Sequence, residues 1–281
     1  LESEFLERGT IIDSHSLGGL LALQYAPGAA PHRTAETPTV VIWCGPGWEP
    51  WTPDQINGKG LGGSETAVVL LAEEMVKRGL RVMVYAEAEG TWNGVHYRRY
   101  DKWSQMPVWM FIGWRNPAVF DAPIQADLKY LWMHDTDAQD SLTPERAAKI
   151  DSILVLSKWH RDHMRTKYAL DVDKFTVIGN GIDPTRFAGE EQREDRIVYS
   201  SSADRGLEQA LELWPEIRKR TKAEFHVYYG WENFDLMGGP RDFKKKIEEL
   251  AKQDGVVWRG RVPQDELARE MMKAGVLFYP G

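Results

Sequence analysis

A glycine-rich segment between an apolar run and an amphipathic run has the residue types of an anion-binding turn. Residues 61–65 read Leu-Gly-Gly-Ser-Glu. Gly62 and Gly63 let the backbone approach a ligand closely, and Ser64 is placed to cap the helix expected after it, whose N-terminus favours negative charge. A phosphate or a sugar hydroxyl group would fit this turn. An ordinary capped loop is the alternative, because the G-x-G-x-x-G spacing of a dinucleotide site is missing.

A second candidate anion site follows a later apolar run. Ser200, Ser201 and Ser202 come before Arg205 and Gly206, and a predicted helix begins directly after them. A guanidinium group with hydroxyl groups at a helix start can hold a diphosphate through charge-assisted hydrogen bonds. A solvated capping loop is again the alternative.

Alternating strands and helices must position these segments. Short β-branched runs alternate with runs of helical period from Thr39 onward, which is the pattern of parallel βαβ units. We expect strands at 40–43, 82–85, 108–112, 130–133, 153–156 and 175–178, and then at 197–199, 225–229, 256–258 and 276–279. The predicted helices include 66–78, 207–220, 243–252 and 264–273.

The predicted fold class is therefore α/β, with two Rossmann-like domains in tandem. We expect an N-terminal extension at 1–38, a first domain at 39–187, a charged linker at 188–195 and an incomplete second domain at 196–281. Ligands of such sheets bind at the carboxyl ends of the strands, so we expect a cleft between the two domains. The chain has no initiator methionine and stops after a strand-like run, which indicates a piece of a longer protein.

Composition excludes several classes of protein. The chain has 281 residues, of which 42% are hydrophobic, and its net charge of −7 gives no reason to expect nucleic acid as a partner. Cys44 is the single cysteine, so an internal disulfide is excluded and a reducing, cytoplasmic location is expected. No apolar run approaches the ~20 residues of a transmembrane segment.

Five motifs in this order resemble the GT-B glycosyltransferases of the retaining family four type, also called glycosyl transferases group 1. The resemblance spans residues 40–281. Its motifs are Gly62-Gly63-Ser64-Glu65, Leu156-Ser157-Lys158-Trp159, Asn180-Gly181-Ile182-Asp183 with Phe187, Ser202-Ala203-Asp204-Arg205-Gly206-Leu207, and Trp258-Arg259-Gly260-Arg261-Val262 with the later Leu277-Phe278-Tyr279-Pro280.

The resemblance implies a hexosyltransferase-type enzyme without a cofactor or metal. It would transfer a sugar from a UDP- or GDP-activated donor to an unknown glycan, lipid or small-molecule acceptor, with retention of configuration. The implied catalytic residues are His134, which would face the transferred sugar, and Arg205, which would neutralise the diphosphate. The other implied donor-binding residues are Gly62, Gly63, Ser201, Ser202, Gly206, Gly260, Arg261 and Val262, and the implied junction residues are Ser157, Asn180, Gly181 and Asp183.

Two departures from the family pattern bear on activity. Members usually place an arginine and a lysine near the first turn of the second domain, whereas here Ser200 and Ser201 stand near the arginine position and Arg205 near the lysine position. Two glutamates eight residues apart normally follow the Tyr-Pro strand, and this chain ends before them. We therefore expect the chain alone to be catalytically impaired.

Three other functions stay open from the sequence. Asp135 and Asp137 form the Asp-x-Asp pattern with which metal-dependent GT-A transferases hold manganese, although we favour loop or cap roles for both. Ser16 lies in a partial hydrolase nucleophile elbow. A nucleotide-sugar-binding module without activity is the third.

Isolated aromatic residues also invite functional interpretations. His160 and His163 are spaced for one helix face but lack a third metal ligand, so we expect both at the surface. Trp48 and Trp51 are candidate sugar-stacking platforms before the glycine pair.

Overall fold

The chain folds as two compact units. The computed structural model describes residues 38–47, 49–138 and 140–280. The first unit holds the described residues before Trp51 together with Gly63–Ile182, and the second holds Trp51–Gly62 and the residues from Asp183 onward. Each unit contains one largely parallel sheet with helices, so the expected α/β class with two Rossmann-like domains is confirmed. The segment 51–62, which we expected in the first domain, packs with the second unit instead.

The first unit is built on an eight-stranded sheet. Its order is β3-β4-β2-β1-β5-β6-β7-β8, and only β3 is antiparallel to its neighbour. The strands are β1 (Thr39–Trp43), β2 (Arg81–Ala86), β3 (Gly90–Trp92), β4 (Val95–Arg99), β5 (Val108–Trp114), β6 (Ala126–Trp132), β7 (Ser152–Val155) and β8 (Phe175–Val177). The prediction had six of these strands. It missed the β3–β4 hairpin, whose two-residue turn at Asn93 and Gly94 has positive φ at both positions.

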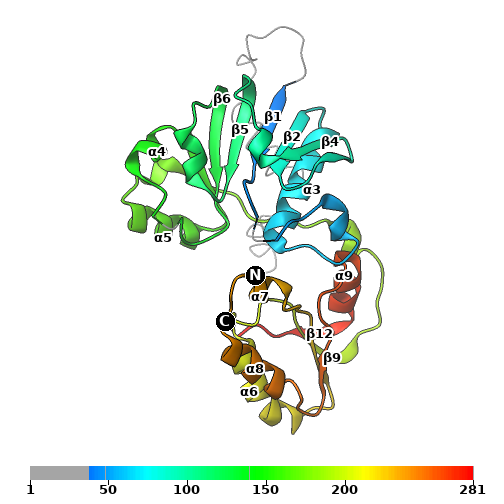
Figure 1. Ribbon diagram of the computed structural model, residues 1–281. Coiled ribbons are helices and arrows are strands. Elements are labelled where there is room, and N and C mark those ends of the chain that lie inside the picture. Colours follow the sequence, from blue (N-terminus) through cyan, green and yellow to red (C-terminus); the bar gives the residue numbers. More distant parts are fainter. Residues whose placement is uncertain (1–37, 48, 139, 281) are drawn as a thin grey trace, which may run out of the picture. The chain divides into compact units, whose positions relative to one another are not determined.

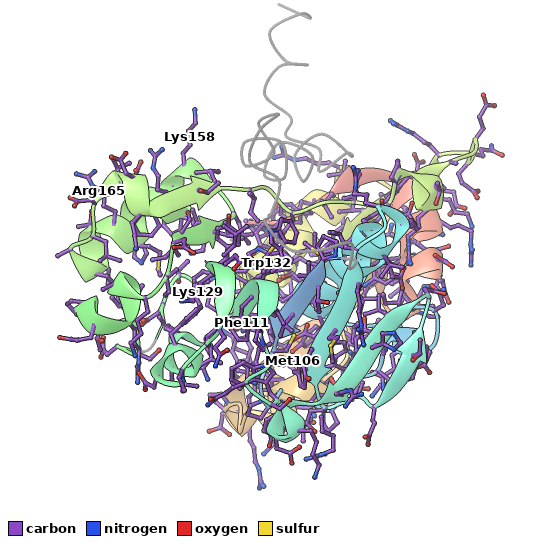
Figure 2. All side chains as sticks on the ribbon, turned by 90° about the horizontal axis from the view of Figure 1, so that it is seen from above. Met106, Phe111, Lys129, Trp132, Lys158 and Arg165 are labelled. Carbon is purple, nitrogen blue, oxygen red and sulfur yellow. The ribbon has the colours of Figure 1, made fainter. Side chains whose placement is uncertain are left out.

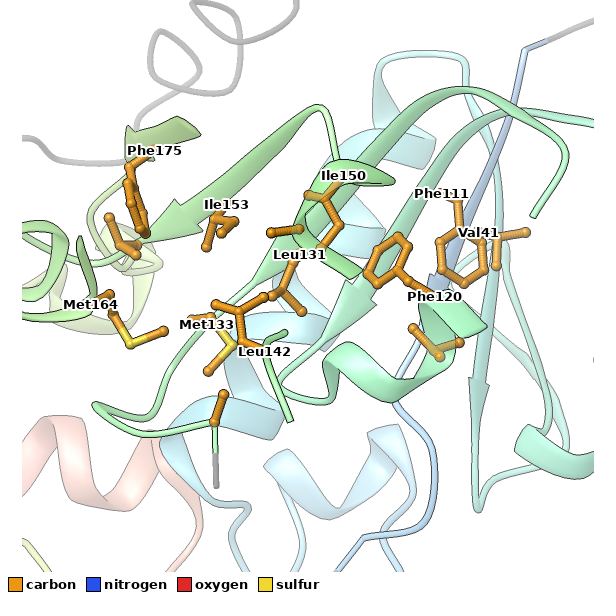
Figure 3. Packing of buried hydrophobic residues seen from close by; sticks show 14 of the residues in the cluster. Val41, Phe111, Phe120, Leu131, Met133, Leu142, Ile150, Ile153, Met164 and Phe175 are labelled. Atoms are coloured by element: carbon orange, nitrogen blue, oxygen red, sulfur yellow. The ribbon is translucent and has the colours of Figure 1, made fainter. Parts of the chain in front are cut away.

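Both faces of this sheet are buried. Along the central strands, successive residues such as Val40, Val41 and Ile42 are all inaccessible to solvent, as expected for parallel strands covered on both sides. In the described part of this unit, the α-helices are α3 (Gly63–Lys77), α4 (Pro144–Ala148) and α5 (Lys158–Tyr168). Short 3₁₀ turns lie in the connections before β5, β6 and β8: η2 (Tyr100–Lys102), η3 (Pro117–Asp121) and η4 (Val172–Lys174). Figure 3 shows one face of the core, where the ring of Phe111 lies beside Phe120 with centroids 5.9 Å apart.

The second unit has a smaller, wholly parallel sheet of order β11-β10-β9-β12. Its strands are β9 (Glu194–Tyr199), β10 (Glu224–Val227), β11 (Val256–Trp258) and β12 (Ala274–Leu277), and its helices are α6 (Leu207–Arg218), α7 (Glu232–Leu236), α8 (Arg241–Leu250) and α9 (Gln264–Lys273). Two 3₁₀ turns, η1 (Pro53–Ile56) and η5 (Pro184–Phe187), belong to the same unit. Figure 1 shows α6 beside α8, and both cover the buried side chains of Phe225 and Val227.

The strand order fixes where each sheet can bind a ligand. In the first unit the chain winds outward from β1 to β2 and then returns to place β5 on the other side of β1. In the second unit it winds from β9 to β11 and returns to place β12 beside β9. Such a change of direction opens a crevice at the carboxyl ends of the two strands, so each unit has one expected binding edge. Within the described residues, no helix is both long and apolar enough to cross a membrane.

Phe111 provides a test of the core. We expect Phe111→Ala to destabilise the first unit by about 3–5 kcal/mol, because it removes a fully buried ring and leaves a cavity. Trp159→Ala is the matched control, since 63% of the Trp159 surface is exposed. Urea denaturation followed by circular dichroism measures both. Equal midpoints for the two variants would contradict the assigned core.

Candidate functional site

The edge where β1 meets β5 gathers polar groups from distant parts of the sequence. Cys44 follows β1, Arg115 follows β5, and Glu65 lies in the first turn of α3. Cys44 is buried, and burial and the nearby Glu65 carboxylate raise the pKa of its thiol above the usual range. A thiol held in its protonated form is a poor nucleophile. The chemistry of this edge therefore falls to the charged residues and to the histidine that follows the next strand.

His134 lies two residues beyond β6, between two tryptophan side chains. Its ring centroid is 4.5 Å from that of Trp132 and 5.9 Å from that of Trp114, both edge-on. Figure 2 labels Trp132 at the centre of the first unit. Burial disfavours the charged imidazolium and the Arg115 cation adds to this, so the pKa of His134 falls from 6.5 to about 4. At neutral pH the ring is therefore uncharged.

Arg115 joins three elements at this edge. Its Nε donates to Oδ2 of Asp135 over 2.6 Å and its Nη2 to Oδ1 over 2.9 Å, and its Nη1 lies 3.7 Å from Oε1 of Glu65. Its backbone N–H donates to the carbonyl oxygen of Trp132, and its φ of +63° is unusual for a residue with a side chain. This arginine was not among the predicted site residues. Its position directly after an apolar strand was the only signal in the sequence.

His160 holds the same loop from the other side. Only 4% of its surface is exposed, so the expectation of a surface position was wrong. Its Nε2 lies 2.9 Å from the carbonyl oxygen of Asp135, and its Nδ1 accepts the backbone N–H of Leu156. Because Nδ1 accepts, Nε2 carries the proton and donates to Asp135. In Figure 2, Lys158 and Arg165 of the same helix project outward.

The two aspartates of the Asp-x-Asp pattern serve different partners. Asp135 binds Arg115, whereas Asp137 accepts from the hydroxyl group of Tyr168 over 2.8 Å and pairs with Lys167 over 2.7 Å. Among the described residues, no group of three His, Cys, Asp or Glu side chains is arranged to hold a metal ion. The structure therefore accounts for both carboxylates through cationic and hydroxyl partners.

Gly62 and Gly63 lie at the start of α3, the helix whose first turn carries Glu65. Because α3 begins at Gly63, Ser64 lies in its first turn and is not the N-cap that we expected. A Cβ at Gly63 would meet no atom within 4 Å, so the backbone here is open to a ligand. Gly62 belongs to the second unit and Gly63 to the first.

In the second unit, the loop after β9 occupies the binding edge next to β12. The hydroxyl group of Tyr199 donates to the carbonyl oxygens of Ser202 and Arg205 over 2.7 and 2.8 Å, which fixes the turn. Gly206 is the N-cap of α6 with a φ of +90°, a conformation that favours glycine. Arg205 is exposed and, among the residues that the structure describes, has no ion-pair partner. Ser201 and Ser202 are partly exposed beside it.

The residues after β11 lie at the same edge of the second sheet. Gly260 has a φ of +71°, and a Cβ there would meet nothing within 4 Å. At Gly60, whose φ is +85°, a Cβ would overlap the carbonyl oxygen of Val262 and approach the Arg261 side chain. Gln264 also donates to the carbonyl oxygen of Leu61 over 3.0 Å. The segment 51–62 thus packs on the loop of Gly260, Arg261 and Val262.

Two of the predicted junction residues, Ser157 and Asp183, cap helical segments. Ser157 caps α5 by accepting the N–H of His160, and Asp183 caps η5 by accepting that of Thr185. A hydrogen bond from the Thr185 hydroxyl group, together with that backbone N–H and the Arg186 cation, lowers the pKa of the Asp183 carboxyl group. Asn180 is exposed and Gly181 is half-buried just before the boundary of the units at Ile182.

One of the remaining candidate residues has a structural outcome. Trp51 is 3% exposed, so its ring packs in the core and is not the predicted sugar platform. Ser16 and Trp48 lie outside the described residues.

Several solved structures are similar to this chain in fold. A glycosyltransferase from Rickettsia africae matches with a TM-score of 0.59 at 11% identity, over 87% of this chain and 73% of that chain. Sucrose-phosphate synthase from Thermosynechococcus elongatus matches with a TM-score of 0.60 at 12% identity, over 88% and 76%. HepE from Anabaena, in complex with UDP and glucose, matches with a TM-score of 0.55 at 10% identity, over 86% and 73%.

The GT-B fold expected from the sequence is therefore confirmed, since these structures are glycosyltransferases of that fold. No protein-family model matches the chain. No curated protein matches its sequence either.

Gly60 tests the packing of segment 51–62. We expect Gly60→Ala to destabilise the second unit by about 1–2 kcal/mol for the left-handed backbone, and by a further amount because Cβ overlaps Val262. Gly238→Ala is the control, with a φ of +70° and no atom within 4 Å of a Cβ. Thermal denaturation compares the two. A loss no larger than that of the control would show that the segment does not pack on this loop.

Proposed function

We propose that this chain is the glycosyl-transferring part of an enzyme that uses a nucleoside diphosphate sugar, with UDP or GDP as the leaving group. The acceptor is a hydroxyl group of a glycan, a lipid or a small molecule. The observation that carries the proposal is Arg205, an exposed arginine that forms no ion pair with another described residue, in the turn before α6 at the binding edge of the second sheet. A guanidinium group at this position can bind a diphosphate.

The proposed reaction proceeds on one face of the donor sugar. The acceptor oxygen forms a bond to the anomeric carbon, and the bond between that carbon and the diphosphate oxygen breaks. Because the acceptor attacks the face from which the diphosphate leaves, configuration is retained. The acceptor proton passes to an oxygen of the leaving diphosphate, and no metal is required. Arg205 stabilises the negative charge that develops on the diphosphate.

The remaining site residues have supporting roles in this proposal. Ser201, Ser202 and Gly206 bind the diphosphate beside Arg205, and the backbone of Gly260, Arg261 and Val262 meets the base. His134 contacts the transferred sugar as an uncharged ring, and Gly62 and Gly63 provide open backbone for the sugar. The presence of UDP and glucose in HepE supports a uridine nucleotide, because that protein shares the fold.

Replacement of Arg205 tests the diphosphate site. We expect Arg205→Ala to weaken the binding of UDP or GDP by about 1.5–3 kcal/mol, the contribution of a charged hydrogen bond, which is roughly a ten- to hundredfold rise in Kd. Isothermal titration with both nucleotides measures this change. Arg220→Ala, at the far end of α6, is the control and should bind as the parent does. Unchanged affinity in Arg205→Ala would remove the main support for the proposal.

Replacement of His134 separates binding from transfer. We expect His134→Ala to lower turnover by about ten- to a thousandfold while nucleotide affinity changes less than threefold, because the ring contacts the sugar and not the diphosphate. The assay uses the chain with the C-terminal glutamate segment of the family restored, and it follows nucleotide release and product formation with a panel of nucleotide sugars. Thermal stabilisation by a donor without any product would instead identify a binding module.

A further inference from the structure

We propose that Arg115 is a positioning residue for His134: it binds both carboxylate oxygens of Asp135, the next residue along the chain, so that this carboxylate is paired with the guanidinium group and not with the imidazole ring. The role in turnover rests on the proposed function. The effect on the ring itself does not, because it can be measured without any substrate.

The geometry supports a single arrangement of these side chains. Two hydrogen bonds of 2.6 and 2.9 Å align the guanidinium with the carboxylate of Asp135, which follows His134 directly in the chain. The Arg115 guanidinium also lies 5.0 Å from the ring centre of Trp114, one of the two tryptophans that flank His134. The cation is thus held between the aromatic ring and the carboxylate. A lysine could not make the same paired contact, because it offers a point charge in place of a planar fork.

The backbone of Asp135 is held as firmly as its side chain. His160 donates from Nε2 to the carbonyl oxygen of Asp135 over 2.9 Å, and Ser157 and Leu156 fix His160 in turn. Asp135 is therefore held at its side chain by Arg115 and at its carbonyl oxygen by His160. This restraint comes from β5 on one side and α5 on the other.

The charged groups around His134 act in opposite directions. Arg115 at the end of β5 and His160 on α5 oppose protonation of the ring, whereas Asp135 favours it. Glu65 of α3 lies 3.7 Å from Arg115 and partly offsets its charge. Burial is the largest cause of the low pKa of His134, and the Arg115 cation is the next. An uncharged ring keeps one nitrogen free to accept a hydrogen bond, which imidazolium cannot do.

The test is a titration of the His134 ring by NMR in the substrate-free protein. The chain has seven histidines, and His134→Gln assigns the signal. In the parent we expect a pKa of about 4. Arg115→Met removes the opposing cation and releases Asp135, so the pKa should rise by roughly one unit, while burial keeps it below that of an ordinary histidine. Asp135→Asn should lower the pKa of His134 or leave it unchanged.

The opposite response of the two variants is the decisive result. General loosening of the loop would expose the ring and raise its pKa in both variants. The double variant Arg115→Met with Asp135→Asn should lie below Arg115→Met alone, because no carboxylate is left to stabilise the cation. If Arg115→Met does not fold, Asp135→Asn still decides, since a rise of the pKa in that variant overturns the proposal.

Kinetics provide a second measurement. In Arg115→Met, kcat at pH 5 should fall about twofold relative to kcat at pH 8, with KM for the donor within twofold, because roughly half of the His134 rings are then protonated at the lower pH. Arg99→Met is the matched control, since it breaks an exposed arginine–aspartate pair with two hydrogen bonds in the same unit. A loss of kcat that is equal at both pH values indicates a merely structural role and overturns the proposal.

Discussion

Two bonds from the Arg115 guanidinium to Asp135 connect the ends of β5 and β6 in the first unit. The distance of 3.7 Å between Arg115 and Glu65 extends the contact to the start of α3. The ends of parallel strands carry carbonyl groups that the sheet leaves unpaired, and the loops that follow them differ in length and direction. A charged cross-link between these loops restricts them at the edge where a ligand binds. The orientation of His134 between Trp114 and Trp132 depends on that restriction.

The second unit restrains its own edge with neutral groups. The hydroxyl group of Tyr199, on the last residue of β9, binds two carbonyl oxygens of the loop that follows, and the ring of Tyr279 lies nearly parallel to it with centroids 6.1 Å apart. Burial raises the pKa of the Tyr199 hydroxyl group, so it remains a donor over the physiological range. Because the loop is fixed through its backbone, the Arg205 side chain stays available to a ligand. The two edges therefore differ in electrostatics: carboxylates of the first unit neutralise Arg115, whereas Arg205 has no ion-pair partner among residues 38–47, 49–138 and 140–280.

The sequence predicted the strands well where β-branched and aromatic runs were bounded by turns, and α9 was predicted at its observed bounds. The β3–β4 hairpin was missed because β3 spans three residues and leaves no periodic pattern. His160 was wrongly placed at the surface, because its neighbours in α5 are charged and its partners Leu156 and Asp135 are joined to it only by the fold. Trp51 was taken for a platform since a polar loop surrounds it, yet its ring is buried in the second unit.

The partners of Asp135 and Asp137 show why charged motifs are hard to interpret from sequence alone. Two carboxylates separated by one residue are a pattern that can bind a divalent cation. Here the partners come from 20 residues before Asp135 and from 30 and 31 residues after Asp137, distances that no local pattern reveals. A bidentate guanidinium competes with a metal for the same carboxylate oxygens, and the protein carries it at all times. The function of Asp135 thus follows from Arg115, a residue whose importance becomes visible only when β5 and β6 lie side by side.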